Sequence, residues 1–479
     1  MPKDTCIISE IGSFFKNNES NKAIHCIMNT IKQINLRSSH IDIEKRSNCK
    51  LTSLQVLELL LLFPFFMIKN AFGYDHSALS NLFFCQKDMF YRFMEQNDMN
   101  WRKLLYTVSL RLYNRIKVRS DLKASTSCLI IDDTDLPKTG FRTEMIGRIY
   151  SHVHHKSILG FKGLFMCHTD GKTQMMLDFS LHGEEGKNKE KPQGLTTIQR
   201  SKRFTKERAD TAAVNERIGE YKQSKITRSI EMVKTAIKKG VRFDYLLVDS
   251  WFTCSELLQF ITSRHIKCHL MGMIKMRKTK YITEYGTLKA SDIIGKLSKS
   301  KSVKYSRRLN CYYAQIEVTY AKRKVKLFFC KRGRKGNWNA FLTTNTKLDF
   351  FEAYRIYAMR WAIEVCFAEM KGLLKLGKCQ ARNFSSQIAS ISITMMQYNI
   401  LSYIKRFESY ETIGGLFRQT TLGAVELSVT DKIWEIILDV VAIIANLFSA
   451  DEEEIIKNIV SNNEKCKRIF EIFEFRKAV

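Results

Sequence analysis

The sequence predicts a mixed α/β fold in which one sheet is flanked by helices. Two observations carry this prediction. Between residues 127 and 274, short apolar runs with the composition of strands alternate with segments of helical pattern. On either side of that stretch, apolar residues recur at spacings of three and four, which is typical of helices. We therefore expect an α/β centre between two helical ends.

The composition indicates a folded and strongly basic protein. A chain of 479 residues corresponds to about three domains of ~150 residues. It is 45% hydrophobic and has only 4 Pro, so most of it can bury a core. Its 78 Lys and Arg exceed its 48 Asp and Glu, which gives a net charge of +30 spread along the whole chain. Nucleic acid is the commonest partner of such a protein, with a ribosomal or membrane-surface protein as the alternative.

Cysteine usage and the N-terminus favour a cytosolic location. The 13 Cys contain no C-x-x-C pair, so we expect reduced thiols and neither a disulfide framework nor a zinc ribbon. Met1–Ser13 lacks a basic leader followed by an apolar core, which argues against a secretion signal. The apolar run Leu54–Ile68 is too short for a membrane span and includes Glu58 and Pro64, so it is expected to form a buried helix.

Residues 1–123 are expected to form a helical N-terminal region that binds DNA. Helical periodicity recurs in Ile24–Ile34, Leu51–Ile68 and Trp101–Val118. The last of these has an aliphatic stripe opposite a basic one. That basic stripe suits contact with phosphates, although a solvated charged face explains it equally well.

Residues 124–383 carry the pattern expected of the α/β centre. Asp-Gly within Thr169–Lys172 predicts a hairpin between its two flanking strands. Phe243–Phe252 is almost continuously apolar, as in a strand buried on both faces. The predicted elements, in order, are the strands Ser127–Leu136, Ile158–His168 and Thr173–His182, the helix Ile226–Lys239 ending at Gly240, the strand Phe243–Phe252, the helix Ser255–Arg264 and the strand Lys267–Ile274.

Two further regions complete the predicted organisation. Residues 277–346 alternate polar and apolar residues among many Lys and Arg, which predicts a small antiparallel β-rich insertion. Residues 384–479 return to helical periodicity and are expected to supply core or a dimer surface. Asp431–Phe448 is strongly amphipathic there, and Ser449-Ala-Asp-Glu452 fits a capping box.

A long helix predicted over Leu348–Lys371 carries the most specific pattern. At 100° per residue, Tyr357, Arg360, Glu364 and Lys371 share one face within about 60°. These polar groups on a mostly apolar helix would face solvent, one another, or an anionic ligand with metal. A salt-bridged surface stripe is the alternative, because Arg360 and Glu364 form an i, i+4 pair.

Acidic residues follow two of the predicted strands. Asp132 and Asp133 are placed at the end of the first strand, and Asp249 near the end of Phe243–Phe252. A carboxylate beside a buried sheet is costly unless it is paired or bound to metal. Because ligands of α/β folds bind outside the carboxyl ends of strands, two such Asp residues and Glu364 could converge there and hold two Mg²⁺ ions.

The spacing Y-(2)-R-(3)-E-(6)-K, formed by Tyr357, Arg360, Glu364 and Lys371, resembles the signature of the insertion-sequence-four family of bacterial DDE transposases. The resemblance covers about residues 126–383 and implies a ribonuclease-H-like mixed sheet with a β-rich insertion before the last catalytic helix. It implies that Asp132, Asp249 and Glu364 are catalytic and bind two Mg²⁺ ions, with Mn²⁺ as a substitute. Tyr357, Arg360 and Lys371 would then contact DNA phosphates.

Two positions of the resemblance stay open. Asp133 rivals Asp132 as the first carboxylate, and Asp132 is preferred because the family's Ser or Thr lies two residues further on, here Thr134. Where family members often have Asp-Arg, this chain has Asp249-Ser250-Trp251, so no role expected of that arginine carries over.

The resemblance also implies an activity. Such a protein would excise an insertion sequence at its terminal inverted repeats and join it to target DNA by two-metal phosphoryl transfer. Its partner would be double-stranded DNA, bound by a homodimer on paired ends in the nucleoid of the cytoplasm, with no membrane. The alternatives are a non-catalytic or domesticated DNA-binding protein of the same fold and a metal-dependent, structure-specific nuclease.

Weaker signals extend the predicted DNA-binding surface. The basic clusters Ser201–Arg208 and Lys331–Lys335 suit backbone contacts. Arg203 and Lys206 represent the first cluster, and Arg332 represents the second. Trp338 is added because the resemblance suggests that an aromatic residue of the insertion could stack on a base. The same role is open to Trp251, but ordinary packing is preferred for this residue, because interior aromatic side chains usually belong to the core. His152, His154, His155 and His168 lack the spacing of a zinc finger.

Overall fold

The fold was analysed in a computed structural model. It describes residues 22–41, 43, 51–77, 79–80, 83, 85–119, 125–408 and 410–422, and five positions between 440 and 447. The chain forms two compact units, which are described separately. The first comprises Met1–Leu104, Leu373–Lys375 and Ser385–Val479, and the second comprises Leu105–Gly372 and Leu376–Phe384. Met1–Ser13, most of Asp431–Phe448 and the predicted capping box lie outside the described residues.

The first unit is helical where it is described. Thr52 caps α3 (Ser53–Leu62) by accepting from the backbone N–H of Gln55, and Val56–Leu62 are all buried. The predicted buried helix over Leu54–Ile68 is confirmed only as far as Leu62, because a 3₁₀ turn follows over Phe63–Phe66 and Met67 is 56% exposed. None of the helices described is both long and apolar enough to cross a membrane. The elements are α2 (Lys22–Ile34), η2 (Ser38–His40), α3 (Ser53–Leu62), η3 (Phe63–Phe66), α4 (Ala71–Tyr74), α6 (Lys87–Met94), the start of α7 (Trp101–Arg119) and most of α15 (Phe384–Phe407).

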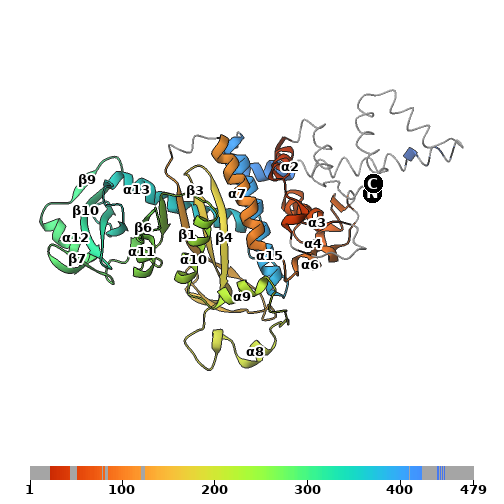
Figure 1. The fold of residues 1–479 in the computed structure, drawn as a ribbon, viewed down its shortest axis with the longest axis horizontal. Helices are drawn as coiled ribbons and strands as arrows, with labels where there is room; N and C mark the ends of the chain where they lie inside the picture. The colour runs from red at the N-terminus through yellow and green to blue at the C-terminus, as the bar shows by residue number, and fades with distance from the viewer. Residues whose placement is uncertain are drawn as a thin grey trace. The chain divides into compact units, whose positions relative to one another are not determined.

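The second unit is built on a twelve-stranded sheet (Figure 1). Its strands are β1 (Cys128–Pro137), β2 (Gly147–Ser151), β3 (Lys156–Thr169), β4 (Gln174–His182), β5 (Tyr245–Val248), β6 (His269–Ile274), β7 (Lys280–Thr283), β8 (Gly286–Lys289), β9 (Lys304–Ser306), β10 (Cys311–Tyr320), β11 (Arg323–Arg332) and β12 (Asn339–Thr343). Its helices are the remainder of α7, η5 (Pro192–Gly194), α8 (Thr197–Ser201), α9 (Val214–Tyr221), α10 (Lys225–Lys238), α11 (Ser255–Ile261), α12 (Ala290–Lys299), α13 (Phe350–Ala358), η6 (Met359–Trp361) and α14 (Ala362–Gly372).

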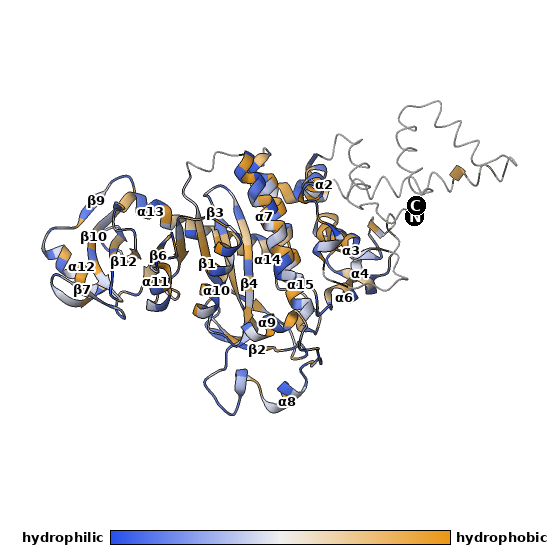
Figure 2. Cartoon of the chain, viewed as in Figure 1, coloured by the Kyte–Doolittle hydropathy of each residue, from blue (hydrophilic) through white to orange (hydrophobic). Residues whose placement is uncertain are grey.

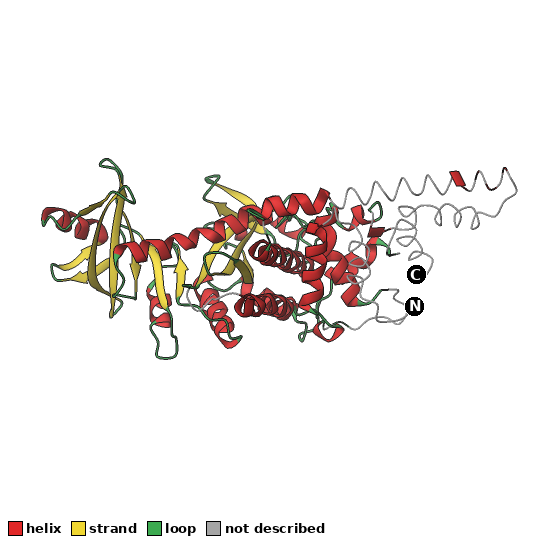
Figure 3. Cartoon of the chain, turned by 90° about the horizontal axis from the view of Figure 1, so that it is seen from above, coloured by secondary structure: helices red, strands yellow, loops and turns green. Residues whose placement is uncertain are grey.

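The centre of the sheet has ribonuclease-H-like topology. The strand order begins β2-β3-β1-β5-β6, and β4 pairs with β3. β1 is antiparallel to β3 but parallel to β5, and β5 is parallel to β6. Apolar residues, orange in Figure 2, recur along β1 and β3. Helices (red in Figure 3) pack against the strands, with α14 against β1 and α9 and α10 against β4. The predicted fold class is confirmed.

The predicted hairpin and helix ends are confirmed in detail. β3 and β4 are joined through Gly171, whose φ of +84° is open to glycine at little cost. Ser224 caps α10 by accepting from the backbone N–H of Thr227, and the helix is followed by Gly240 at φ +82°. The strand predicted over Phe243–Phe252 is shorter, because the chain turns away after Val248.

The insertion is antiparallel, as predicted, and it is continuous with the central sheet. Its strand β12 pairs with β6 of the central sheet, and the order continues β12-β11-β10-β7-β8. The prediction of β structure over residues 277–346 is right, but the region also contains α12 (Figure 1). Hydrogen bonds between β6 and β12 therefore join the insertion to the centre of the sheet.

The helix predicted over Leu348–Lys371 is interrupted. Asp349 caps α13 by accepting from the backbone N–H of Glu352, and α13 gives way to the 3₁₀ turn η6 before α14 begins. The prediction of one continuous helix is wrong, because a tighter i to i+3 turn replaces the α-helical pattern there. Arg360 lies in that turn.

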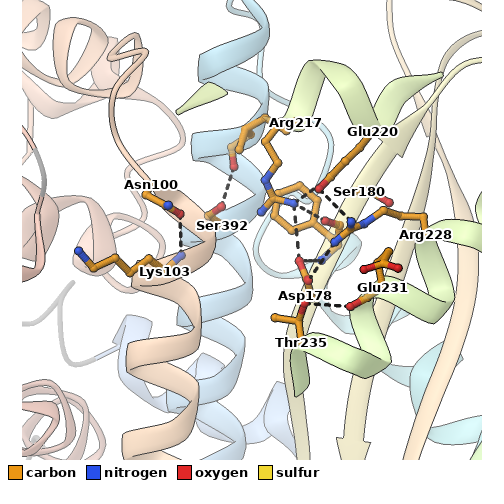
Figure 4. A network of polar contacts seen from close by, with 12 residues as sticks. Asn100, Lys103, Asp178, Ser180, Arg217, Glu220, Arg228, Glu231, Thr235 and Ser392 are labelled. Atoms are coloured by element: carbon orange, nitrogen blue, oxygen red, sulfur yellow. Dashed lines mark hydrogen bonds and ion pairs between the residues drawn. The ribbon is translucent and has the colours of Figure 1, made fainter. Parts of the chain in front are cut away.

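A buried ionic cluster joins α9 and α10 to β4 (Figure 4). Asp178 of β4 is fully buried, with one carboxylate oxygen 3.6 Å from Nη1 of Arg217 and the other 3.7 Å from Nη2 of Arg228. Glu220 lies 3.4 Å from both guanidinium groups. Burying these charges costs desolvation energy, which their mutual pairing offsets. The cluster fixes both helices on one face of the sheet.

Candidate active site

Two acidic residues are neighbours because of the register of two parallel strands. The paired residues of β1 and β5 end with Ile131 opposite Val248. The next residues, Asp132 and Asp249, therefore lie side by side where the parallel pairing stops. The prediction that Asp132 ends its strand is wrong, because β1 continues to Pro137 while β5 stops.

Arg360 links the first of these acids to the predicted helix acid. Its Nη1 is 2.9 Å from Oδ2 of Asp132, and its Nη2 is 2.6 Å from Oε1 of Glu364. The side chains of Asp132 and Arg360 are 15% and 16% exposed, whereas Glu364 is 34% exposed. One guanidinium group thus pairs with a carboxylate on a strand and with another on a helix. The alternative of a salt-bridged surface stripe does not describe Arg360, because this side chain is only 16% exposed.

The carboxyl group of Asp132 is in an unfavourable place for a negative charge. Burial and, to a smaller extent, the nearby charge of Asp249 raise the pKa of Asp132 to about 7, although Arg360 acts in the opposite direction. The backbone N–H of Asp133 also donates to Oδ1 of Asp132 over 2.8 Å. A cation beside Asp132 and Asp249 would favour the ionised form of both groups.

Tyr357 and Lys371 also face the sheet around these acids. The hydroxyl of Tyr357 donates to the carbonyl oxygen of Val248 over 3.2 Å, and its ring stacks on Phe341 of β12 at a centroid distance of 5.2 Å. Burial raises the pKa of Tyr357 to about 12. Lys371 donates to Oγ1 of Thr134 over 2.6 Å. All four residues of the spaced motif thus lie on the side of α13–α14 that faces β1 and β5.

A tight turn fixes Asp249. Its Oδ1 accepts hydrogen bonds from the backbone N–H groups of Trp251 (2.8 Å) and Phe252 (3.1 Å). The hydroxyl of Thr253 donates to the Asp249 carbonyl over 2.8 Å. A Cβ atom at Gly272 of β6 would collide with that hydroxyl, so only glycine fits beside this turn. Sequence reasoning missed Thr253 and Gly272, since nothing in their spacing signals this contact.

Asp133 lies on the opposite side of the sheet from Asp132, because successive side chains of a strand alternate. Its Oδ2 forms an ion pair with Nζ of Lys225, the first residue of α10. The two candidates for the first carboxylate therefore have different partners: Asp132 pairs with Arg360 and Asp133 with Lys225. Lys225 was also missed, because it is 92 residues away in the sequence.

Three carboxylates around this site suit a hard cation, although they do not form a complete metal-binding arrangement. Asp132, Asp249 and Glu364 offer only carboxylate oxygens, which Mg²⁺ prefers. No group of three or more His, Cys, Asp or Glu side chains among the described residues is arranged to hold a metal ion. Glu364 instead pairs with Arg360. The raised pKa of Asp132 is the observation that fits a cation, since two adjacent carboxylates lack full compensation.

The predicted basic clusters differ in how their side chains are used. Arg203 donates to the carbonyl of Ile146 and to the side chain of Gln193, so it already braces a loop. Lys206 is half-buried, whereas Arg332 is exposed.

Trp338 belongs to an aromatic and basic group on the insertion. Nζ of Lys331 lies 5.2 Å from the ring centroid of Trp338 and 5.5 Å from that of Tyr312. Tyr312 pairs with Tyr305 of β9 across the strands, with ring centroids 4.9 Å apart. Aromatic rings beside cations form a surface suited to nucleic acid.

Trp251 is not core. The prediction of ordinary packing is wrong, because 44% of this residue is exposed in the turn after Asp249. The next residue, Phe252, is 1% exposed and takes the buried position instead.

Comparison with known proteins gives one family match. The family described as DDE superfamily endonuclease matches residues 84–278, which include Asp132 and Asp249. The piggyBac transposase in its synaptic complex with hairpin DNA aligns with a TM-score of 0.42 and 13% identity, over 88% of this chain and 80% of that one. The NurA nuclease of Sulfolobus solfataricus aligns with a TM-score of 0.23 and 11% identity, over 58% and 86%. No curated protein matches the chain.

Proposed function

We propose that the chain is a DNA transposase that cuts at the terminal inverted repeats of an insertion sequence and joins the ends to target DNA. The observation that carries the proposal is the register of β1 and β5, which makes Asp132 and Asp249 neighbours while Arg360 connects Asp132 to Glu364. The match to DDE superfamily endonucleases over the segment with both Asp residues supports it. Membership of the insertion-sequence-four family remains a prediction.

Asp132, Asp249 and Glu364 are the residues that would hold the metal, which we propose to be two Mg²⁺ ions with Mn²⁺ as a substitute. When bound, the ions would supply activation of water or a DNA 3′-hydroxyl and stabilisation of the leaving oxygen. Arg360 would hold the carboxylates of Asp132 and Glu364 at a fixed separation. The turn that accepts two backbone N–H groups would hold Asp249 in place.

Double-stranded DNA, as transposon ends and target, is the proposed partner. The net charge of +30 supports a polyanionic substrate. Tyr357, Arg360 and Lys371 would contact phosphates beside the scissile bond, and Arg332 and Trp338 would extend contact along the insertion. Lys206 and Arg203 would contribute less to DNA binding. Lys206 is half-buried, and Arg203 already donates to the side chain of Gln193. A homodimer on paired ends, with DNA also bound by residues 1–123, completes the proposal.

A nuclease that cuts without joining is the second candidate. The family that matches residues 84–278 is described as an endonuclease, and the same acids would serve either reaction. A strand-transfer assay with pre-cut ends separates the two. Joined product supports the transposase, and cutting with no joining supports the nuclease.

The test of the proposal is Glu364→Gln, which removes a charge and keeps the shape of the side chain. Cleavage of DNA carrying the element's ends is expected to fall by about 100-fold or more, because metal sites contribute several kcal/mol to such reactions. DNA affinity should change little, as measured by fluorescence anisotropy. Glu352→Gln is the matched control and should cut normally, because Glu352 is an exposed residue of α13. Retained cleavage by Glu364→Gln would reject the proposal.

A further inference from the structure

The acids that follow the paired parts of β1 and β5 lie just beyond the last residues that these two strands pair. The parallel pairing ends with Ile131 opposite Val248, and Asp132 and Asp249 come next. Two carboxylates so close together repel each other when both are charged. Their separation therefore depends on side-chain contacts and on the turn that follows β5.

Lys225, the first residue of α10, makes one of these contacts from the other side of β1. Its Nζ forms an ion pair with Oδ2 of Asp133, whose side chain points away from that of Asp132. The same Nζ lies 4.0 Å from the centroid of the Trp251 ring in the turn after β5. Because the side chains of Lys225 and Asp133 are only 20% and 22% exposed, water and salt screen these contacts only partly. A single ammonium group thus contacts both β1 and the turn.

The turn that Lys225 contacts is the one that fixes Asp249. The backbone N–H groups of Trp251 and Phe252 donate to Oδ1 of Asp249 over 2.8 and 3.1 Å. The Trp251 ring attracts the ammonium group of Lys225, and the buried Phe252 ring packs beside it with centroids 4.8 Å apart. A shift of Trp251 away from Lys225 would therefore move the N–H groups that hold the Asp249 carboxylate.

We propose that Lys225 is a positioning residue of the metal site, which keeps the carboxylates of Asp132 and Asp249 at the separation that shared cations require. The inference rests on the proposed function and deepens it, because it names what holds two of the three proposed ligands together. Lys225 acts on the two acids through their neighbours Asp133 and Trp251. Groups that orient metal ligands in this way typically contribute 10–100-fold to metal affinity. Both contacts need the positive charge, so removing that charge should release the turn from β1.

In the experiment, the full-length protein without DNA is titrated with Mn²⁺, and free Mn²⁺ is measured by electron paramagnetic resonance. We expect Lys225→Met, which keeps most of the side-chain length but removes the charge, to weaken Mn²⁺ binding about tenfold. Lys225→Arg should retain most of the affinity, because a guanidinium group also pairs with carboxylates and stacks on aromatic rings. Lys234→Met is the matched control, since Lys234 of α10 pairs with Glu231 over 2.8 Å and its Nζ lies 5.9 Å from the Phe260 ring centroid.

Equal Mn²⁺ affinity in wild type and Lys225→Met would overturn the inference, and so would a Lys225→Arg variant as weak as Lys225→Met. The affinity separates this role from two others. A lysine that only stabilises the fold would change Tm, and one that only contacts DNA phosphates would change DNA binding in EDTA, but both would leave the Mn²⁺ affinity of the folded protein unchanged. Wild type that binds Mn²⁺ no more tightly than Asp249→Asn would instead reject the proposed metal site itself, together with the role of Lys225.

Discussion

At the residue scale, Arg360 explains how several negative charges are tolerated next to the sheet. Asp132 and Asp249 are adjacent, and the side chain of Asp132 is only 15% exposed, so its negative charge is costly unless it is paired. Arg360 supplies that pairing and at the same time binds Glu364. Burial and the neighbouring charge of Asp249 outweigh the effect of Arg360, so the pKa of Asp132 is raised to about 7.

That raised pKa has a consequence for stability in metal-free protein. The folded state holds the Asp132 proton up to pH about 7, whereas an unfolded Asp releases it near pH 4. Between these values the folded state binds more protons, so the free energy of unfolding falls as pH rises and then levels off above pH 7. Asp132→Asn should remove this contribution and flatten the decline of Tm between pH 5 and 7. Thermal unfolding in EDTA at each pH measures it.

The control for the pH series is Asp292→Asn, which removes an exposed carboxylate from α12. It should leave the pH dependence of Tm as in wild type. A wild-type Tm that rises between pH 5 and 7 by an amount that Asp132→Asn abolishes would contradict the prediction, because it would mean that Asp132 is more acidic in the folded state.

The placement of side chains could be predicted from the sequence where a local spacing pattern determines it. The spacing of Tyr357, Arg360, Glu364 and Lys371 placed all four on the face that meets the sheet. Whether Asp132, Asp249 and Glu364 perform catalysis stays a proposal. Contacts such as Lys225 with Asp133 were out of reach, because side chains far apart in sequence leave no periodic signal.

At the scale of elements, the buried ionic cluster determines how α9 and α10 attach to β4. Asp178 pairs with two guanidinium groups, and all of these side chains are at most 8% exposed. Removing the negative charge would leave buried cations undercompensated.

Asp178→Asn is therefore expected to lower the free energy of unfolding by about 3–5 kcal/mol. The matched control is Glu231→Gln on α10, whose 2.8 Å pair with Lys234 is about half exposed and should contribute less than ~1 kcal/mol. Denaturant midpoints of the two variants give the comparison. Equal, small effects would mean that the cluster is not a main anchor of the two helices.

Elements with a strong local signal were predicted well. Asp-Gly and strand composition predicted the β3–β4 hairpin, and Gly240 predicted the end of α10. β2 was missed because Gly147–Ser151 is too short and mixed to stand out. The 3₁₀ turn at Arg360 was also missed, since no proline or glycine marks it.

At the scale of the whole sheet, the pairing of β12 with β6 makes the insertion part of the second unit's core. Ala340–Thr343 of β12 align with Met271–Ile274 of β6. The alternation of polar and apolar residues predicted the β-rich insertion but not this junction, because the pairing depends on the register of two strands that are far apart in the sequence.

This continuity predicts cooperative opening. Hydrogen exchange measured by mass spectrometry should give peptides from β6, β12 and β11 similar protection, because opening β12 breaks the ladder of its neighbours on both sides. Peptides from α8, whose residues are exposed or half-buried, serve as the fast-exchanging reference. Exchange in β11 and β12 many times faster than in β6 would show that the insertion opens alone.

The continuous strand order also fixes a distance within the second unit. From β1, which bears Asp132, to β11, which bears Lys331 and Arg332, the order passes through β5, β6 and β12, hence four strand spacings. Each spacing is about 4.8 Å, so the separation between the acids and the insertion's cations changes only in increments of that width. A longer loop would leave this separation between the two strands unchanged. Only the gain or loss of a whole strand between them would change it.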